Sequence, residues 1–181
     1  MLISDYNTRV MTPERAKLLG ELLEELAADA RGFIPDEAWV PSQKAFSLPY
    51  VELAVVRRAL SGPVEILLKH RSDKNWNGWH IPGGVWRTKQ TLEECIAVLR
   101  AQELGEGVRT TLLAKGDWEK WHDHPYGHPI SHIAICRGDN IIESETLKWF
   151  ATTPDEIIVD GGHHARFIES VLGQTERENL V

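Results

Sequence analysis

A strand, a glycine turn and a capped helix follow one another near the middle of the sequence, and this succession most constrains the fold. Residues 77–81 alternate polar and apolar side chains, as a short strand does, and the Pro-Gly-Gly sequence at 82–84 then requires a tight turn. Thr91 with Glu94 three residues later is a capping box, which begins a helix by satisfying N–H groups of its first turn. Gly105 is placed to end that helix. The segment therefore predicts a strand and a helix fixed against one core.

Aliphatic runs on both sides of this segment predict the other strands of a sheet. The predicted strands are 48–57, 63–71, 108–114 and 129–136. The first two are apolar enough to be buried on both faces. A last helix is predicted through residues 167–172, after a Gly-Gly-His-His sequence at 161–164. Strands combined with helices predict an α/β fold, and the family resemblance given below implies an α/β/α sandwich with a mixed central sheet.

The N-terminal part predicts an additional helix over residues 12–31. Thr12 is a good N-cap, Pro13 suits the first helical position, and Gly32 ends the helix. Its leucines form a wide stripe opposite glutamates, so the helix either packs on its own domain or contributes a homodimer contact. Residues 31–47 lack periodicity and predict a connector. We therefore expect a helical extension and connector at 1–45 and one main domain at 46–181.

Composition excludes several classes of function. The net charge of −7 argues against nucleic-acid binding, which depends on clustered Lys and Arg. Binding of small phosphorylated ligands is compatible with this charge. Cys95 and Cys136 are too few for a disulfide framework and are expected to be reduced core residues. No signal peptide and no apolar run of membrane-spanning length is evident, which predicts a cytoplasmic protein with no membrane partner.

The glycine turn and its helix resemble a degenerate Nudix box, whose full form is G-x5-E-x7-R-E-U-x-E-E-x-G-U. With Gly84 as the first glycine, Glu103 occupies the last glutamate and Gly105 the final glycine. The other key positions depart from the pattern: they hold Gln90, Val98, Leu99 and Gln102. The resemblance implies a hydrolase of a nucleoside diphosphate linked to another group. It also implies Mg²⁺ or Mn²⁺ as the cofactor, because the family's box holds divalent cations.

One branch of that family, the GDP-mannose mannosyl hydrolases, departs from the box in a similar way. It also has leucine at the position of Leu99 and ends its box in x-Glu-Leu-Gly, as this chain does at 102–105. The resemblance implies three metal ligands, namely Glu103, the carbonyl of Gly83, and Glu143. It makes a nucleotide sugar the leading substrate class. A carboxylate near a helix C-terminus faces the negative end of the helix dipole, which also favours a functional role for Glu103.

The same resemblance assigns substrate contacts to the first two strands. Arg71 ends the second strand where the branch has a basic residue that contacts the diphosphate, and a guanidinium suits paired phosphate oxygens. Arg71 is therefore predicted to bind substrate and to neutralise charge on the leaving group. Glu52 is costly to bury in an apolar strand without a partner, so it is predicted to contact substrate. The branch's catalytic base falls on Ser144, which is not a plausible base, so Glu145 and a histidine of residues 122–132 are the alternatives.

The segment between the last two predicted strands is rich in histidine and aromatic residues. His122 and His124 are candidate substrate contacts that would stack on a base or transfer protons near neutral pH. A zinc site of His122, Asp123, His124 and His128 is an alternative, and a loop without metal is a third. Further along, Trp149-Phe150 followed by a helix capped near Thr152 extends the Nudix likeness to residues 46–172.

Two functions follow from these residues. The first is a divalent-metal-dependent Nudix-type hydrolase that uses Glu103 and Arg71. The second is a catalytically impaired Nudix-fold protein that binds a nucleotide or a regulatory partner. It is motivated by the carboxylates missing at Gln90, Leu99 and Gln102.

Overall fold

The computed structural model of the protein describes residues 11–29, 33–60, 62–122, 124 and 127–181. The elements in chain order are α1 (Pro13–Ala28), α2 (Asp36–Ala45), β1 (Pro49–Arg58), β2 (Val64–Ser72), β3 (Asn77–His80), β4 (Gly83–Val85), α3 (Leu92–Glu103), β5 (Arg109–Lys120), β6 (Ile130–Asp139), β7 (Leu147–Phe150) and α4 (His163–Glu178). The predicted capping box is present at the start of α3. Gly105 ends that helix with a φ of 104°, which glycine adopts without strain.

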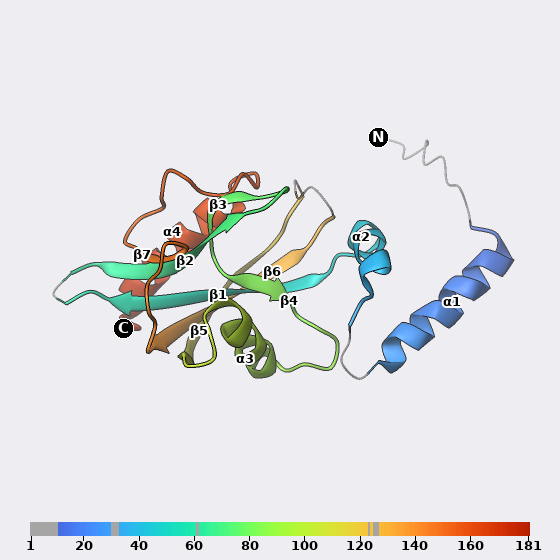
Figure 1. Ribbon diagram of the computed structural model, residues 1–181, viewed down its shortest axis with the longest axis horizontal. Helices are drawn as coiled ribbons and strands as arrows, with labels where there is room; N and C mark the ends of the chain where they lie inside the picture. Colours follow the sequence, from blue (N-terminus) through green and yellow to red (C-terminus); the bar gives the residue numbers. More distant parts are fainter. Residues whose placement is uncertain (1–10, 30–32, 61, 123, 125–126) are drawn as a thin grey trace.

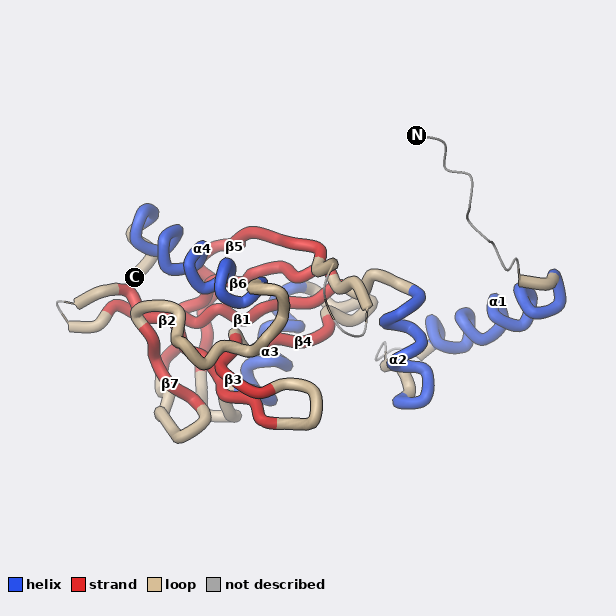
Figure 2. Tube along the Cα trace, turned by 90° about the horizontal axis from the view of Figure 1, so that it is seen from above, coloured by secondary structure: helices blue, strands red, loops and turns tan. Residues whose placement is uncertain are grey.

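A mixed sheet forms the centre of the molecule (Figure 1). Its strand order is β3-β2-β1-β6-β5, with β4 paired to β1 and β7 paired to β2. Strands β1 and β6 run parallel, and the other pairs are antiparallel. Helix α3 covers one face and α4 the other, as the tube seen from above also shows (Figure 2). The predicted α/β/α sandwich with an extra N-terminal helix is therefore confirmed.

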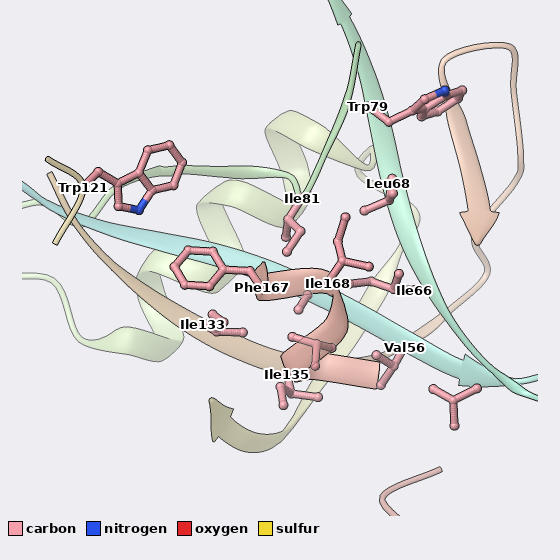
Figure 3. Packing of buried hydrophobic residues seen from close by; sticks show 13 residues of the cluster. Val56, Ile66, Leu68, Trp79, Ile81, Trp121, Ile133, Ile135, Phe167 and Ile168 are labelled. Atoms are coloured by element: carbon pink, nitrogen blue, oxygen red, sulfur yellow. The ribbon is translucent and has the colours of Figure 1, made fainter. Parts of the chain in front are cut away.

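Alternation along β1 separates two apolar clusters. Val51, Leu53 and Val55 pack with the apolar side of α3, whereas Ala54 and Val56 pack with α4. Figure 3 shows the α4 cluster, in which Phe167 and Ile168 lie among aliphatic side chains of β1, β2 and β6. Both cysteines are buried and reduced, as expected. Because successive side chains of a strand point to opposite faces, Glu52 points to the α4 face.

The two glycines of β4 admit close neighbours on opposite faces. Glu52 of β1 lies directly across from Gly83, and its carboxylate occupies the place where a Cβ at Gly83 would be. A Cβ at Gly84 would lie 2.8 Å from Cδ2 of Leu99 on α3. Neither position can hold a larger residue without movement of its neighbour, so the pair fixes β4 between β1 and α3.

Three sequence predictions need correction. The connector expected at 31–47 contains α2, because the N-terminal Asp36 and Glu37 outweigh the proline at position 41. No helix begins near Thr152, since residues 151–162 form bends, turns and irregular chain with one isolated bridge from Ile157 to Trp79, and the helix starts at His163. Strand β5 is longer than predicted and continues to Lys120, with irregular pairing to β6 along its length.

Helix α1 forms as predicted but does not pack on the sheet. It projects beyond α2, away from the sandwich (Figures 1 and 2). No α1 residue is buried by the described part of the chain, and Leu18 and Leu22 are 54% and 51% exposed. The leucine stripe is therefore not covered by the domain, and within the described ranges only the C-terminal end of α1 reaches it, where the Ala27 carbonyl accepts a hydrogen bond from Lys89. A homodimer contact stays a prediction, as does the division at residue 45.

None of the helices in the ranges given above has both the length and the apolar character needed to cross a bilayer. The cytoplasmic location stays a prediction from the sequence.

Substitution Gly83→Ala is expected to lower the free energy of unfolding by about 1–3 kcal/mol, because the new methyl must displace the Glu52 carboxylate and the Val51 carbonyl. Denaturant unfolding measures the change. Gly107→Ala is the matched control, because its Cβ would meet nothing within 4 Å. Equal midpoints for the two variants would contradict the packing account.

Candidate active site

The strand β4 separates two hollows that lie on opposite faces of the sheet. The first, the box pocket, has a volume of about 290 Å³. It is lined by Gly83, Gly84 and Val85 of β4, by Arg87 and Gln90 of the following loop, by Cys95, Val98, Leu99, Gln102 and Glu103 of α3, and from the N-terminal part by Phe33, Ile34, Asp36 and Trp39. Glu103 and the glycine pair, which the sequence predicted as neighbours, are thus brought together at one pocket.

The Glu103 carboxylate is already paired with a lysine of the sheet. Lys69 of β2 lies 2.8 Å from Oε2 of Glu103 and donates a second hydrogen bond, 3.3 Å long, to its backbone carbonyl. The ammonium therefore neutralises the acid and also satisfies an orphan carbonyl at the end of α3. The Lys69 ammonium therefore explains why a carboxylate is tolerated at the negative end of the helix dipole. This pairing was not predicted from the sequence.

The third predicted metal ligand lies elsewhere. Glu143 pairs with Arg57 at 3.6 Å, near the far end of β1, and does not line the box pocket. Within the described ranges, no group of three or more His, Cys, Asp or Glu side chains is arranged to hold a metal ion. A divalent cation prefers six or more oxygen ligands, and here one carboxylate is engaged by an ammonium. These residues do not form a divalent-metal site by themselves.

The second hollow, the histidine cavity, has a volume of about 80 Å³ and opens on the α4 face of β4. Its lining includes Tyr50, Glu52, Arg71, Trp76, His80, Gly83, Trp121, His124, Ser131 and His164. Three of the predicted substrate contacts, Glu52, Arg71 and His124, are thus brought together. The space admits a small group but not a nucleotide, which would have to lie at its mouth.

Glu52 is the buried acid of this cavity, with only 4% of its surface exposed. Ser131 Oγ donates a 2.8 Å hydrogen bond to Oε1, while Oε2 lies 3.9 Å from Nε2 of His164. Burial raises the pKa of the Glu52 carboxyl, and the nearby imidazole and hydroxyl oppose that rise. A carboxyl in this position has the environment of an acid–base group.

His164 lines the cavity and Asp160 holds its imidazole in place, and neither was predicted from the sequence. Nδ1 of His164 lies 2.6 Å from Oδ2 of Asp160, which also accepts from the backbone N–H of His164 at 2.9 Å. Although burial alone would raise it, the pKa of the Asp160 carboxyl is lowered, because His164 and two backbone N–H groups donate to it. The sequence signal that could have indicated them is Asp-Gly-Gly-His-His at 160–164, which was interpreted only as the segment that leads into the last helix.

Two other groups at the cavity differ in charge, since His80 is neutral and Arg71 is positive. Burial, with His164 nearby, lowers the pKa of His80 to about 3, so His80 is neutral at physiological pH. Its Nδ1 lies 2.8 Å from the carbonyl of Ile81, which favours a proton on that nitrogen. Arg71 supplies the positive charge, and its Nε donates to the carboxylate of Asp73, which shapes the loop after β2.

The histidine-rich segment divides between two places. His124 lies 5.7 Å from the rings of both Trp76 and Trp121 at the cavity, and burial lowers its pKa. His122 lies near His128 instead, with ring centroids 6.4 Å apart, and does not line the cavity. Asp123, a member of the zinc alternative, lies outside the described residues. The part of the chain that is described holds no metal cluster there, so nothing supports zinc.

Comparison with solved structures shows that the chain has the Nudix fold. No protein-family model matches the sequence, and no curated protein matches it. NrtR of Shewanella oneidensis is 14% identical over 73% of this chain and 64% of its own, with a TM-score of 0.51. Ap4A hydrolase of C. elegans is 15% identical over 75% and 100%, also at 0.51. This chain thus spans less than two thirds of NrtR and the whole of Ap4A hydrolase.

A third similar structure is a larger enzyme. The bifunctional NMN adenylyltransferase/ADP ribose pyrophosphatase of Francisella tularensis is 14% identical over 87% of this chain and 52% of its own, with a TM-score of 0.53. Identities this low establish a shared fold and no more. The activities in those names belong to those proteins.

Substitution Lys69→Gln is expected to raise the affinity of the box pocket for Mn²⁺ by up to about tenfold, which corresponds to about 1.4 kcal/mol. The reason is that Glu103 loses the ammonium that competes with the ion. Electron paramagnetic resonance measures free Mn²⁺. Lys148→Gln is the matched control, because Lys148 lies over the Trp79 ring, away from this pocket. Equal affinities in both variants would show that the ion pair does not limit binding.

Proposed function

We propose that this protein is a Nudix-type hydrolase that acts on a nucleoside diphosphate linked to another group, with nucleotide sugars as the leading substrate class. The observation that carries the proposal is the convergence of Arg71 and Glu52 at one cavity beside Gly83, on a Nudix fold. A guanidinium suits diphosphate oxygens and a buried carboxyl suits a hydroxyl group. Arg71 would then recognise the diphosphate of a nucleotide sugar, and Glu52 would recognise a hydroxyl group of its sugar.

The named activities of similar structures support the broader class of nucleotide derivatives. One of them is an Ap4A hydrolase, and another is an ADP ribose pyrophosphatase. Arg71 is at the mouth of the cavity with part of its side chain in solvent, so it can reach a diphosphate too large to enter. Its charge would stabilise negative charge that develops on the leaving group.

We propose Mg²⁺ or Mn²⁺ as the cofactor, and incubation with and without a chelator tests this requirement separately. The described residues do not form its site alone, so binding would require phosphate oxygens of the substrate. The roles of Glu103, the Gly83 carbonyl and Glu143 as metal ligands stay predictions, as do those of His122 and His124 as substrate contacts.

A second candidate function is binding without hydrolysis. It is favoured by the Lys69–Glu103 ion pair, which leaves the box pocket of the described chain without an unpaired glutamate. In that case the protein would sense a nucleotide or serve a regulatory partner. NrtR, one of the similar structures, has been crystallised with a 27mer DNA. For this chain, the net charge of −7 favours a small ligand over nucleic acid.

A panel of nucleoside diphosphate derivatives separates the two functions. Each compound is incubated with Mg²⁺, with Mn²⁺ and with a chelator, and product release is measured beside binding by thermal shift. We expect turnover of at least one nucleotide sugar, and loss of any metal-stimulated part in Glu103→Gln. Binding of a compound with no product under any condition would replace the hydrolase by the sensor.

Substitution Arg71→Gln is expected to weaken nucleoside diphosphate binding by roughly 10- to 100-fold, since charge-assisted hydrogen bonds contribute about 1.5–3 kcal/mol. Isothermal titration calorimetry measures the affinity. Arg57→Gln is the matched control, because Arg57 is also near a strand end but pairs with Glu65 and Glu143 away from the cavity. Similar losses in both variants would remove Arg71 from the proposed site.

A further inference from the structure

A buried imidazole nitrogen in the histidine cavity has no assigned role. Nε2 of His164 is buried and has no hydrogen-bond partner among the residues that the structure describes. The side chain lines the cavity and is 4% exposed. An unsatisfied buried polar atom costs about 1–3 kcal/mol, so such an atom is expected to have a ligand or a water molecule as its partner.

Asp160 determines which nitrogen of His164 carries the proton. Its carboxylate lies 2.6 Å from Nδ1, and a carboxylate accepts hydrogen bonds, so Nδ1 is the donor. In the neutral ring Nε2 is then a bare acceptor directed into the cavity. Asp160 also accepts from the backbone N–H groups of Gly162 and His164, which fixes its position at the start of α4. The imidazole is therefore held in one orientation and one tautomer.

The distance between His164 and Glu52 suits a water molecule that bridges them from one side. The 3.9 Å from Nε2 to Oε2 of Glu52 is too long for a hydrogen bond, but one water can reach both atoms. The cavity of about 80 Å³ exceeds the roughly 30 Å³ that one water occupies in the liquid. Such a water would have two acceptors, one for each of its hydrogens.

The other titratable groups that line the cavity come from β1, β2, β3 and the segment after β5. Arg71 comes from β2, His80 from β3, His124 from the segment after β5, and Tyr50 from β1. Burial raises the pKa of Tyr50 to about 12, and Gln43 donates a 2.8 Å hydrogen bond to its hydroxyl. The guanidinium is the one fixed positive charge among the described residues that line the cavity. Arg71 also pairs with Asp73 and is partly exposed, and its charge would stabilise an anionic leaving group at the cavity.

We propose that His164 is the general base of this protein, with Asp160 as its positioning residue, and that it activates a water molecule held against Glu52. The inference rests on the proposed hydrolase function and supplies a base that does not depend on the box pocket. Water gives one proton to Nε2, and its oxygen forms a bond to the substrate atom that bears the leaving group. The bond to the leaving oxygen breaks, and its electron pair stays on that oxygen, beside Arg71. The proton then passes from Nε2 to solvent.

The first test reads the tautomer without any substrate. Nitrogen-15 spectra of the histidine rings are recorded for the wild type and for Asp160→Asn. We expect Nε2 of His164 to be unprotonated in the wild type. In the variant the proton is expected to move to Nε2, because the amide of asparagine can donate to Nδ1. A protonated Nε2 in the neutral wild-type ring would overturn the proposal.

The second test measures turnover of the compound that the substrate panel identifies. His164→Gln is expected to lower kcat by about 10²- to 10⁴-fold, the usual contribution of a general base, with or without chelator. His163→Gln is the matched control, because His163 is equally buried at the start of α4 but stacks on Trp121 and pairs with Glu119. Thermal melting of both variants reports whether they fold.

The outcomes separate the base from the function. Turnover retained by His164→Gln, or an equal loss in His163→Gln, overturns the role of His164 and leaves the hydrolase standing. Should the wild type convert no compound of the panel, the hydrolase and its base both fall. If His164→Gln does not fold, the wild-type tautomer spectrum still decides, since Nε2 must be bare for His164 to accept a proton.

Discussion

The close approach of Glu52 to Gly83 is the constraint on which the rest of the site depends. A carboxylate inside an apolar sheet requires a neighbour without a side chain, and Gly83 of β4 provides it across the strand pair. The same carboxylate then needs polar partners, which are the Ser131 hydroxyl and, across 3.9 Å, His164. Because these partners come from β6 and α4, a single buried acid links the sheet to the C-terminal helix.

The alternation of side chains along the strands divides the chemistry between two faces. Glu103 and its partner Lys69 lie on the α3 face, and they neutralise each other. Glu52, His164 and Asp160 lie on the α4 face, where burial raises the pKa of the Glu52 carboxyl and donated hydrogen bonds, against the effect of burial, lower that of Asp160. Gly83 borders both hollows, so the two faces are joined by one residue of the backbone.

Much of the fold could be predicted because its signals are local. The capping box at Thr91, the alternation in β3 and the aliphatic runs of β1 and β2 each act within a few residues. Helix α2 was missed because a proline breaks its periodicity, and the helix expected near Thr152 does not form, since a cap alone does not stabilise a helix without a buried apolar face. The metal ligands drawn from resemblance include Glu143, which lies beside Arg57 instead of the box pocket.

The sequence by itself determined the sandwich, the capped helix after the glycine pair and the prediction of a functional role for Glu52. Periodicity, capping and the cost of a buried charge are local properties that can be read along the chain. Only the tertiary structure decided that Lys69 neutralises Glu103 and that His164 faces Glu52. The first pair is 34 residues apart, and the second joins β1 to α4 across the whole domain. Contacts between such distant residues depend on how the strands pair and twist, and no local pattern in the sequence encodes them.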